Sequence, residues 1–211
     1  MTTANLYYVG DPMCSWCFAF QPTIDAIRSE LSDKVKLCYV MGGLAPDSDV
    51  HMPEETQCYV QENWRVIEAQ TPTRFNWDFW TKCKPRRSTY PSCRAVIAAG
   101  LQDETLTPLM FKGIQNAYYR EAMNPSDLDT LLEVASKVEH PVDLEKLKED
   151  MASEKVEALL QENFVLRRRI KGGGFPSLIL EINGMIVPIQ EGWGQTAEVI
   201  EKLRVGLKPQ G

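Results

Sequence analysis

Two cysteines three residues apart, Cys14 and Cys17, are the side chains in this sequence best suited to chemistry. They lie in the segment DPMCSWCFAF, with Ser15 and Trp16 between them. Two thiols at this spacing could exchange disulfides, contribute to a metal site, or belong to a hydrophobic core. The elements around them and the rest of the chain favour one of these interpretations.

The cysteines are predicted to lie where a first strand leads into a helix. The run NLYYVG, residues 5–10, is rich in β-forming residues and predicts a strand. From Cys14 to Leu31 the apolar residues recur at helical spacing, and Pro22 is expected to kink that helix. Residues 35–41, VKLCYVM, predict a second strand. The order β-α-β predicts a parallel pair of strands joined by a right-handed crossover.

This placement gives the two thiols different environments. Cys14 would lie at the helix N-terminus, among unpaired backbone N–H groups and the positive end of the helix dipole, and both favour a thiolate. Cys17 would lie one turn further on, within disulfide reach of Cys14 but more buried. An exposed, activated thiolate and a shielded second thiol are the two parts that thiol–disulfide exchange requires.

A metal site is the weaker interpretation, because zinc usually needs a second close pair of ligands. The other cysteines and the two histidines form no such pair: Cys38, Cys58, Cys83, Cys93, His51 and His140. We therefore expect no metal and no bound cofactor. Cys38 is expected in the core, and Cys83 and Cys93 could pair across a loop, although a reducing compartment disfavours that disulfide.

Between residues 44 and 170 almost every signal is helical. Ser126 is expected to cap one helix and Gly100 to end another. The helices are expected at about 53–70, 92–100, 105–123, 127–138, a short stretch after Pro141, and 153–169.

The C-terminal part returns to strands. The segment SLILEINGMIVPIQ places Asn183-Gly184 between two apolar runs, which predicts a hairpin with a type I′ turn. A last helix is expected at about 196–205. The whole order is β-α-β, helices, then β-β-α, which predicts an α/β, thioredoxin-like fold with a large all-helical insertion. The predicted units are a thioredoxin-like domain formed by 1–43 and 172–211, and a helical insertion subdomain formed by 44–171.

The segment GGGFPS places Pro176 just before the first hairpin strand. The predicted fold brings this loop beside the N-terminus of the CxxC helix. An X-Pro bond can be cis at modest cost. A cis bond here would present the Phe175 backbone to an extended substrate, in the manner of an added strand. A simple turn after a helix is the alternative.

These motifs together resemble the DsbA-like branch of the thioredoxin superfamily, and most closely its FrnE-type cytoplasmic disulfide oxidoreductases. The resemblance is carried by YYVGDPMCSWCFAF, by GGGFPS before the Asn-Gly hairpin, and by ENWRVIEAQTPTRFNWDFW and PSCRAVIAAG in the helical part. It covers the whole chain. It implies a DsbA-like fold and disulfide oxidoreductase or isomerase activity.

The resemblance also implies a role for each motif residue. Cys14 would be the nucleophile and Cys17 the resolving thiol, with Ser15 and Trp16 tuning the reduction potential. Pro176 would be the cis proline, with Phe175 offering its backbone to the substrate. In some relatives an acidic residue beneath the active site assists proton transfer. The matching strand positions here are tyrosines, and Asp11 is expected in the neighbouring loop.

Composition narrows the class of partner. The chain has 211 residues, a net charge of −6 and 44 % hydrophobic residues, which predicts a sizeable core and disfavours nucleic-acid binding. No apolar run approaches membrane-span length, and MTTANLYYVG lacks the features of a signal peptide, so a cytoplasmic protein is expected. The expected partners are protein or small thiol and disulfide substrates, glutathione among them. Nothing in the sequence predicts an oligomeric state.

Two other functions compete with disulfide exchange. Kappa-class glutathione transferases and related isomerases resemble this architecture, but they typically have serine where this chain has Cys14. A non-catalytic peptide-binding or chaperone module would use the aromatic residues Trp64, Trp77, Phe79 and Trp80 as a cleft. Such a module would keep its activity after loss of both thiols.

Overall fold

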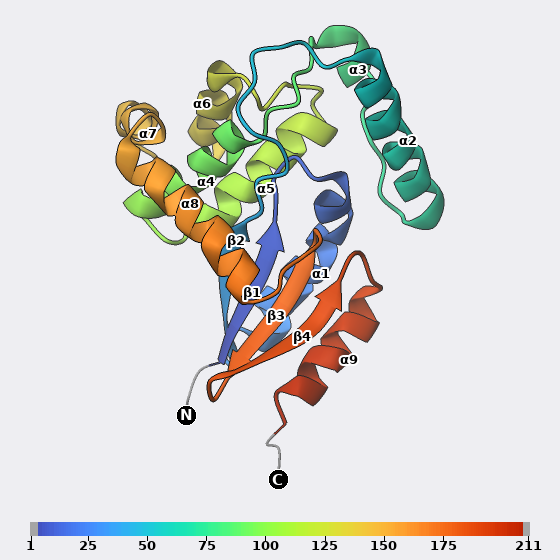
Figure 1. Ribbon diagram of the computed structural model, residues 1–211, viewed down its shortest axis with the longest axis vertical. Helices are drawn as coiled ribbons and strands as arrows, with labels where there is room; N and C mark the ends of the chain where they lie inside the picture. Colours follow the sequence, from blue (N-terminus) through green and yellow to red (C-terminus); the bar gives the residue numbers. More distant parts are fainter. Residues whose placement is uncertain (1–3, 209–211) are drawn as a thin grey trace.

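The computed structural model describes residues 4–208, which form a four-stranded mixed sheet with helices on both faces (Figure 1). The strand order is β2-β1-β3-β4. Strand β1 is parallel to β2 and antiparallel to β3, and β3 is antiparallel to β4. The strands are β1 (Ala4–Gly10), β2 (Val35–Met41), β3 (Ser177–Ile182) and β4 (Met185–Glu191).

Strand β1 lies between β2 and β3, and both of its faces are buried. Alternate residues point to opposite sides of a sheet. Leu6 and Tyr8 join the main core, whereas Tyr7 and Val9 join a smaller cluster on the other face. A strand covered on both faces can be apolar along most of its length, which explains the run that predicted it.

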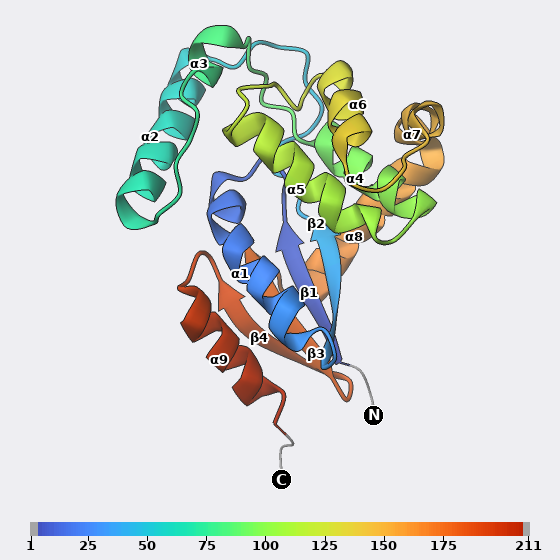
Figure 2. The ribbon, with the colours of Figure 1, turned by 180° about the vertical axis from the view of Figure 1, so that it is seen from behind.

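Three helices cover the sheet. Helices α1 (Ser15–Leu31) and α9 (Thr196–Gly206) lie on one face, and α8 (Glu154–Arg169) crosses the other (Figures 1 and 2). The predicted β-α-β unit is confirmed, with β1 and β2 in parallel register. Pro22 lies inside α1, and the helix runs through it without interruption.

Most of the remaining helices lie beyond the C-terminal ends of β1 and β2 (Figure 1), although Phe111 of α5 packs on Tyr8 and Tyr39 of these strands. Helices α2 and α3 stand on the side where α1 begins, apart from α4 to α7 (Figure 2). The helices of this part are α2 (Glu54–Gln70), α3 (Phe79–Lys82), α4 (Tyr90–Gln102), α5 (Leu106–Tyr119), α6 (Leu128–Lys137) and α7 (Leu144–Met151). Within residues 4–208, no helix is both long and apolar enough to cross a bilayer.

The prediction that Gly100 ends a helix is wrong, because α4 continues to Gln102. A Cβ at Gly100 would lie 2.4 Å from Oγ1 of Thr107 in α5. The glycine is therefore explained by the close approach of two helices rather than by a helix end.

The cap of α6 is also shifted. The sequence predicts Ser126 at the N-cap, but that position is held by Asp127. The buried Ser126 hydroxyl instead donates to the carbonyl of Ser88, 2.8 Å away. A tertiary contact therefore displaces the local capping interaction that the sequence suggests.

The predicted thioredoxin-like α/β fold is confirmed, including the hairpin. Asn183 and Gly184 have φ values of 51° and 77°, as a type I′ turn requires. The division into units 1–43 with 172–211 and 44–171 stays a prediction. The main core cluster contains residues from both units, among them Leu6 and Phe111.

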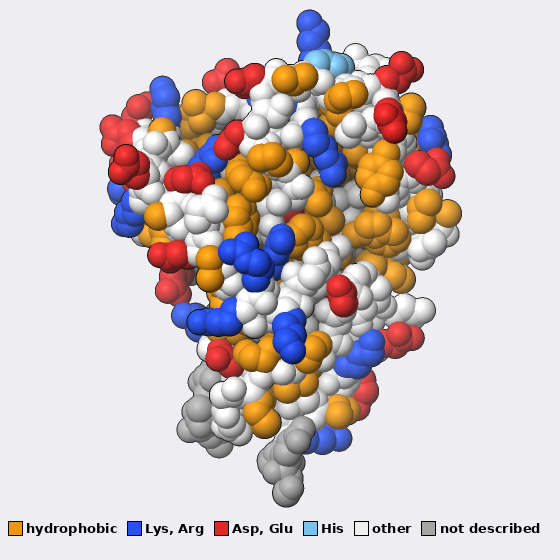
Figure 3. Space-filling model, viewed as in Figure 1, with side chains coloured by type: hydrophobic (Ala, Val, Ile, Leu, Met, Phe, Trp, Pro, Cys, Tyr) orange, Lys and Arg blue, Asp and Glu red, His pale blue; other side chains and the backbone are white. Residues whose placement is uncertain are grey.

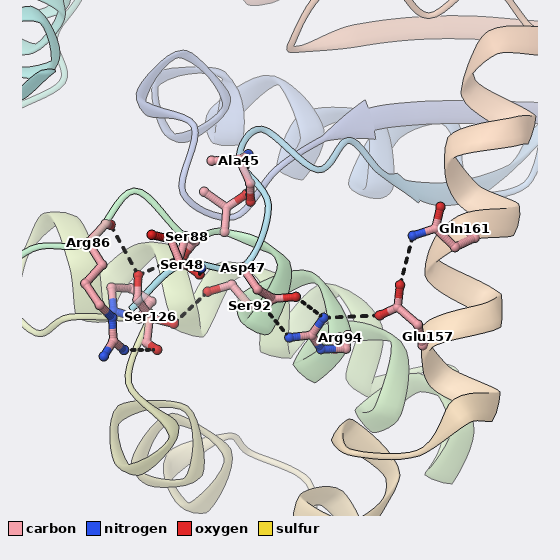
Figure 4. Close-up of polar contacts among 12 residues, drawn as sticks. Ala45, Asp47, Ser48, Arg86, Ser88, Ser92, Arg94, Ser126, Glu157 and Gln161 are labelled. Atoms are coloured by element: carbon pink, nitrogen blue, oxygen red, sulfur yellow. Dashed lines mark hydrogen bonds and ion pairs between the residues drawn. The ribbon is translucent and has the colours of Figure 1, made fainter. Parts of the chain in front are cut away.

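A polar network fastens the segment after β2 to the helices (Figure 4). The Arg94 guanidinium on α4 donates to both Asp47 carboxylate oxygens, at 2.5 and 2.9 Å, and to Glu157 on α8 at 3.2 Å. The side chain of Arg94 is 16 % exposed. Three parts of the chain that are distant in sequence are therefore joined at one guanidinium.

Candidate active site

Cys14 is the N-cap residue of α1, as the spacing of the sequence suggests. Its backbone N–H donates to the Asp11 carbonyl and its carbonyl accepts from Phe18 N–H, each at 3.0 Å. The α1 N-cap carries no side-chain capping hydrogen bond, so the thiol is the side chain at this positive helix end. Cys14 is only 7 % exposed, so this residue, which was expected to be exposed, is nearly buried.

Cys17 lies one turn into α1 and is fully buried. Burial raises the pKa of its thiol well above the usual value, and a hydrogen bond with the Cys14 sulfur and the charge of that sulfur act in the same direction. A hydrogen bond with the Asp11 backbone lowers the pKa of Cys17, but not enough to cancel the rise. Cys17 therefore carries its proton at neutral pH.

The Phe175–Pro176 loop lies beside Cys14. The peptide bond is cis, as expected, and the carbonyl oxygen of Phe175 lies 4.0 Å from Cys14 Sγ. The Phe175 ring rests on Gly42, where an added Cβ would come within 2.5 Å of it. Glycine directly after β2 thus makes room for the ring of the residue whose carbonyl lies beside the thiol.

Ser15 and Trp16, the residues between the cysteines, are both half-buried. Trp16 packs against an aromatic cluster centred on Trp64. Trp64 and Phe79 are fully buried, whereas Trp77 and Trp80 are half-buried. Of the four aromatic residues expected to line a cleft, two therefore belong to the core and two pack at the edge of this aromatic cluster.

Asp11 is the site residue whose role the sequence did not suggest. It is fully buried, and its carboxylate accepts from Met13 N–H at 2.8 Å and from Leu44 N–H and the Thr89 hydroxyl at 2.7 Å each. Burial raises the pKa of Asp11, and these hydrogen bonds oppose the rise. The carboxylate ties the CxxC turn to the segment after β2 and to α4. An aspartate directly after a buried strand was the only signal for it.

Cys93 lies on the other side of this carboxylate. Its sulfur is 3.6 Å from Asp11 Oδ2, and burial raises the pKa of the thiol well above its usual value. Cys83 instead donates to the Ala122 carbonyl at 3.0 Å. Both are free thiols, so the structure does not contain the disulfide considered for them.

The other two cysteines, Cys38 and Cys58, are more exposed than the CxxC pair. Cys38 is half-buried rather than in the core, because β2 is an edge strand. Cys58 on α2 is exposed. Among residues 4–208, no three His, Cys, Asp or Glu side chains are grouped so that they could hold a metal ion.

Comparison with known proteins identifies the family of the chain. A family model described as Thioredoxin matches residues 7–183. No curated protein sequence matches the chain significantly.

Solved structures share the fold along nearly the whole chain. A putative protein disulfide isomerase from Nitrosomonas europaea has 24 % identity and a TM-score of 0.87, with 100 % of both chains covered. The cytosolic disulfide reductase DsbM from Pseudomonas aeruginosa has 22 % identity and a TM-score of 0.77, covering 96 % of this chain and 98 % of its own. The structure of DsbM with GSH is similar at 20 % identity, with a TM-score of 0.76 and the same coverage.

Proposed function

The chain belongs to the thioredoxin family, and on that premise we propose that it is a thiol–disulfide oxidoreductase acting through Cys14 and Cys17. One observation carries the proposal. A cysteine at the N-cap of α1 lies 4.0 Å from the Phe175 carbonyl, with a fully buried second cysteine one turn behind it. This arrangement supports one attacking thiol and one resolving thiol.

In the first step the Cys14 thiolate attacks one sulfur of a substrate disulfide. That bond breaks, one substrate thiolate leaves, and a mixed disulfide joins Cys14 to the other half. The attacking sulfur lies at the N-terminal end of α1, where the helix dipole favours negative charge. The Phe175 backbone beside the thiol is available to an extended substrate segment, with Pro176 shaping that loop.

In the second step Cys17 loses its proton and attacks the Cys14 sulfur. The second substrate thiolate leaves, so the substrate disulfide is reduced and the Cys14–Cys17 pair is oxidised. The reverse sequence oxidises a substrate dithiol. If a substrate thiol attacks the mixed disulfide instead of Cys17, the result is isomerisation. Ser15 and Trp16 between the cysteines set the balance between these directions.

The substrates we infer are protein or small-molecule disulfides, and the location we infer is the cytoplasm. The cytosolic disulfide reductase from Pseudomonas aeruginosa, which has also been solved with GSH, supports both inferences. The FrnE-type assignment stays a prediction.

The test compares Cys17→Ser with Cys14→Ser, each in a Cys58→Ser background that removes the exposed thiol on α2. After incubation with hydroxyethyl disulfide or insulin, Cys17→Ser should accumulate a mixed disulfide at Cys14, located by peptide mass mapping. Cys14→Ser should accumulate none, because Cys17 is fully buried.

The parent Cys58→Ser protein should reduce insulin when a small thiol regenerates it, and both active-site variants should fail. Mixed disulfides on Cys17 in the Cys14→Ser variant would reverse the assigned roles. Insulin reduction that survives loss of both cysteines would overturn the proposed function.

A further inference from the structure

The last turn of α8 places a guanidinium against the active-site loop. Arg167 Nη1 donates to the Gly42 carbonyl at 2.6 Å, and its guanidinium carbon lies 5.2 Å from the centre of the Phe175 ring. Lys and Arg side chains gather over this end of α8, close to hydrophobic side chains of the helical part (Figure 3). Arg167 is thus held by the same two residues that shape the loop beside Cys14.

Among residues 4–208, Gly42 is the one hydrogen-bond partner of the Arg167 side chain. A guanidinium has five N–H donors, and one of them binds Gly42. Within residues 4–208, the arginine ion pairs belong to Arg65, Arg86, Arg94 and Arg204, and none to Arg167. A half-buried guanidinium without a carboxylate partner is suited to binding a planar anion.

A second polar group lies near this guanidinium. The Tyr90 ring lies against Gly43, 3.0 Å from the position of an added Cβ, and Arg167 binds the carbonyl of the neighbouring Gly42. Tyr90 is only half-buried, and it packs on Phe164, the residue that covers Gly43. A phenol and a guanidinium therefore flank the end of β2.

The Arg167 guanidinium and the Cys14 sulfur both lie against Phe175. One residue, Phe175, separates them: its carbonyl lies 4.0 Å from Cys14 Sγ and its ring lies under Arg167. In a glutathione-type tripeptide the sulfur is on the central residue, so a terminal carboxylate lies about 7 Å from it at ~3.3–3.6 Å per residue. That reach is comparable to the size of the one residue, Phe175, that lies between Cys14 and Arg167.

We propose that Arg167 binds the carboxylate of small, glutathione-type disulfides and so selects them as substrates of the Cys14–Cys17 pair. This inference rests on the proposed function. The net charge of −6 gives an anion no general attraction to the molecule, so a fixed local cation is required. The carboxylate accepts two N–H groups of the guanidinium in the fork geometry that lysine cannot reproduce.

The test measures single-turnover oxidation of the reduced protein by two disulfides, glutathione disulfide and the uncharged hydroxyethyl disulfide. Each turnover reduces one substrate disulfide to two thiols and oxidises one Cys14–Cys17 pair, so no other reductant is needed. Arg167→Met should lower the ratio of the glutathione disulfide rate to the hydroxyethyl disulfide rate about tenfold, equivalent to loss of one charge-assisted interaction. The ratio for Arg167→Lys should lie between those of the wild type and Arg167→Met.

Arg168→Met is the matched control, because Arg168 is the next residue on α8, has the same charge and is exposed. It should change both rates by less than about twofold, as for a solvated surface charge. Equal losses for the two disulfides in Arg167→Met would indicate that Arg167 only supports the loop, and would overturn the proposal. Equal effects of Arg167→Met and Arg168→Met would do the same.

Binding of S-methylglutathione, measured by calorimetry, separates failure of this inference from failure of the proposed function. This compound has both carboxylates of glutathione but cannot form a disulfide. Affinity that falls about tenfold in Arg167→Met, in a protein that exchanges neither disulfide, would preserve the anion site and reject the oxidoreductase. If the protein exchanges both disulfides but binds S-methylglutathione equally well with and without Arg167, the anion site alone would be rejected.

Discussion

At the scale of single residues, the thiol of Cys17 controls the second half of the proposed reaction. Only the thiolate attacks, and burial raises the pKa of Cys17 well above its ordinary value. The thiolate fraction at neutral pH is therefore small and grows about tenfold per pH unit below that pKa. We expect release of the second substrate thiol to accelerate with pH from 6 to at least about 8.5, the ordinary cysteine pKa.

This expectation is tested by forming the Cys14 mixed disulfide at low pH and jumping the pH in a stopped-flow instrument. In that species the Cys14 sulfur carries no charge, and burial, the largest cause of the raised pKa, remains. The Cys17→Ser variant should show no release at any pH. A release rate that levels off near pH 7 would contradict the account of Cys17.

Asp11 links the site to pH through stability. Burial raises the pKa of this carboxyl in the folded protein, so the folded state holds the Asp11 proton more tightly than the unfolded chain. The favourable contribution of this proton is present below the unfolded value of about 3.9 and is lost as pH rises through the raised folded pKa. The stability of the wild type relative to Asp11→Asn should therefore fall as pH increases from about 4.

Urea unfolding of both proteins at several pH values gives this difference, because contributions from the other carboxyls cancel. A difference that is constant with pH would mean that the folded pKa of Asp11 is not raised. Thr89→Val is a useful second variant, since it removes one hydrogen-bond donor to the carboxylate. It should raise the pKa of Asp11 further, so the loss of stability with increasing pH should be larger than in the wild type.

At the scale of elements, local patterns predicted most of the sheet and little of the helix packing. Strand β2 and the Asn183-Gly184 turn depend on neighbours in sequence, and both were predicted with the observed bounds. Local patterns suggest capping and stop roles for Ser126 and Gly100, but their actual contacts are with Ser88 and Thr107. A glycine that admits a neighbouring helix cannot be distinguished by sequence from one that ends its own helix.

The same limit applies to the candidate site. The CxxC spacing and the proline loop were visible because their chemistry is local, whereas the role of Asp11 depends on tertiary neighbours. The partners of Asp11 include Leu44 and Thr89, which lie 33 and 78 residues further along the chain. No periodicity or spacing in a single sequence brings those residues together.

The crossing of α4 and α5 provides a prediction at this scale. Gly100→Ala would place a methyl group 2.4 Å from Thr107 Oγ1, too close for an ordinary contact. We expect the free energy of unfolding to fall by about 1–2 kcal/mol, because overpacking outweighs the gain in helix propensity of ~1 kcal/mol.

Thr107→Ala removes the clashing hydroxyl, and the next nearest atom, Thr107 Cβ, would lie 3.7 Å from the alanine methyl group. The double variant Gly100→Ala/Thr107→Ala should therefore recover most of the loss, giving a favourable coupling energy of ~1 kcal/mol in a double-mutant cycle. Additive effects of the two substitutions in urea unfolding would show that the helix crossing does not determine the glycine.

At the scale of the whole molecule, the helices and the sheet share one core. The main cluster joins Leu6, Phe20 and Leu180 of the sheet side to Phe111 and Leu160 of the helical part. Arg94 on α4 forms one ion pair with the segment after β2 and another with α8. The residues of the site are distributed in the same way, since Asp11 bonds Thr89 and Phe175 lies under Arg167.

We therefore expect residues 44–171 and the rest of the chain to unfold together, because neither part can keep its buried apolar surface without the other. Native-state hydrogen exchange in increasing urea tests this. The slowest amides of β1 and β3 should converge on the same unfolding free energy as those of α4 and α5.

Arg94→Met, which removes the ion pairs at a side chain only 16 % exposed, should lower both sets equally, by about 1–2 kcal/mol. Arg65→Met removes an exposed ion pair within α2 and should lower both by less than about 0.5 kcal/mol. Separate plateaus for sheet and helices, with only the helices responding to Arg94→Met, would mean that the inserted helices fold as an independent unit.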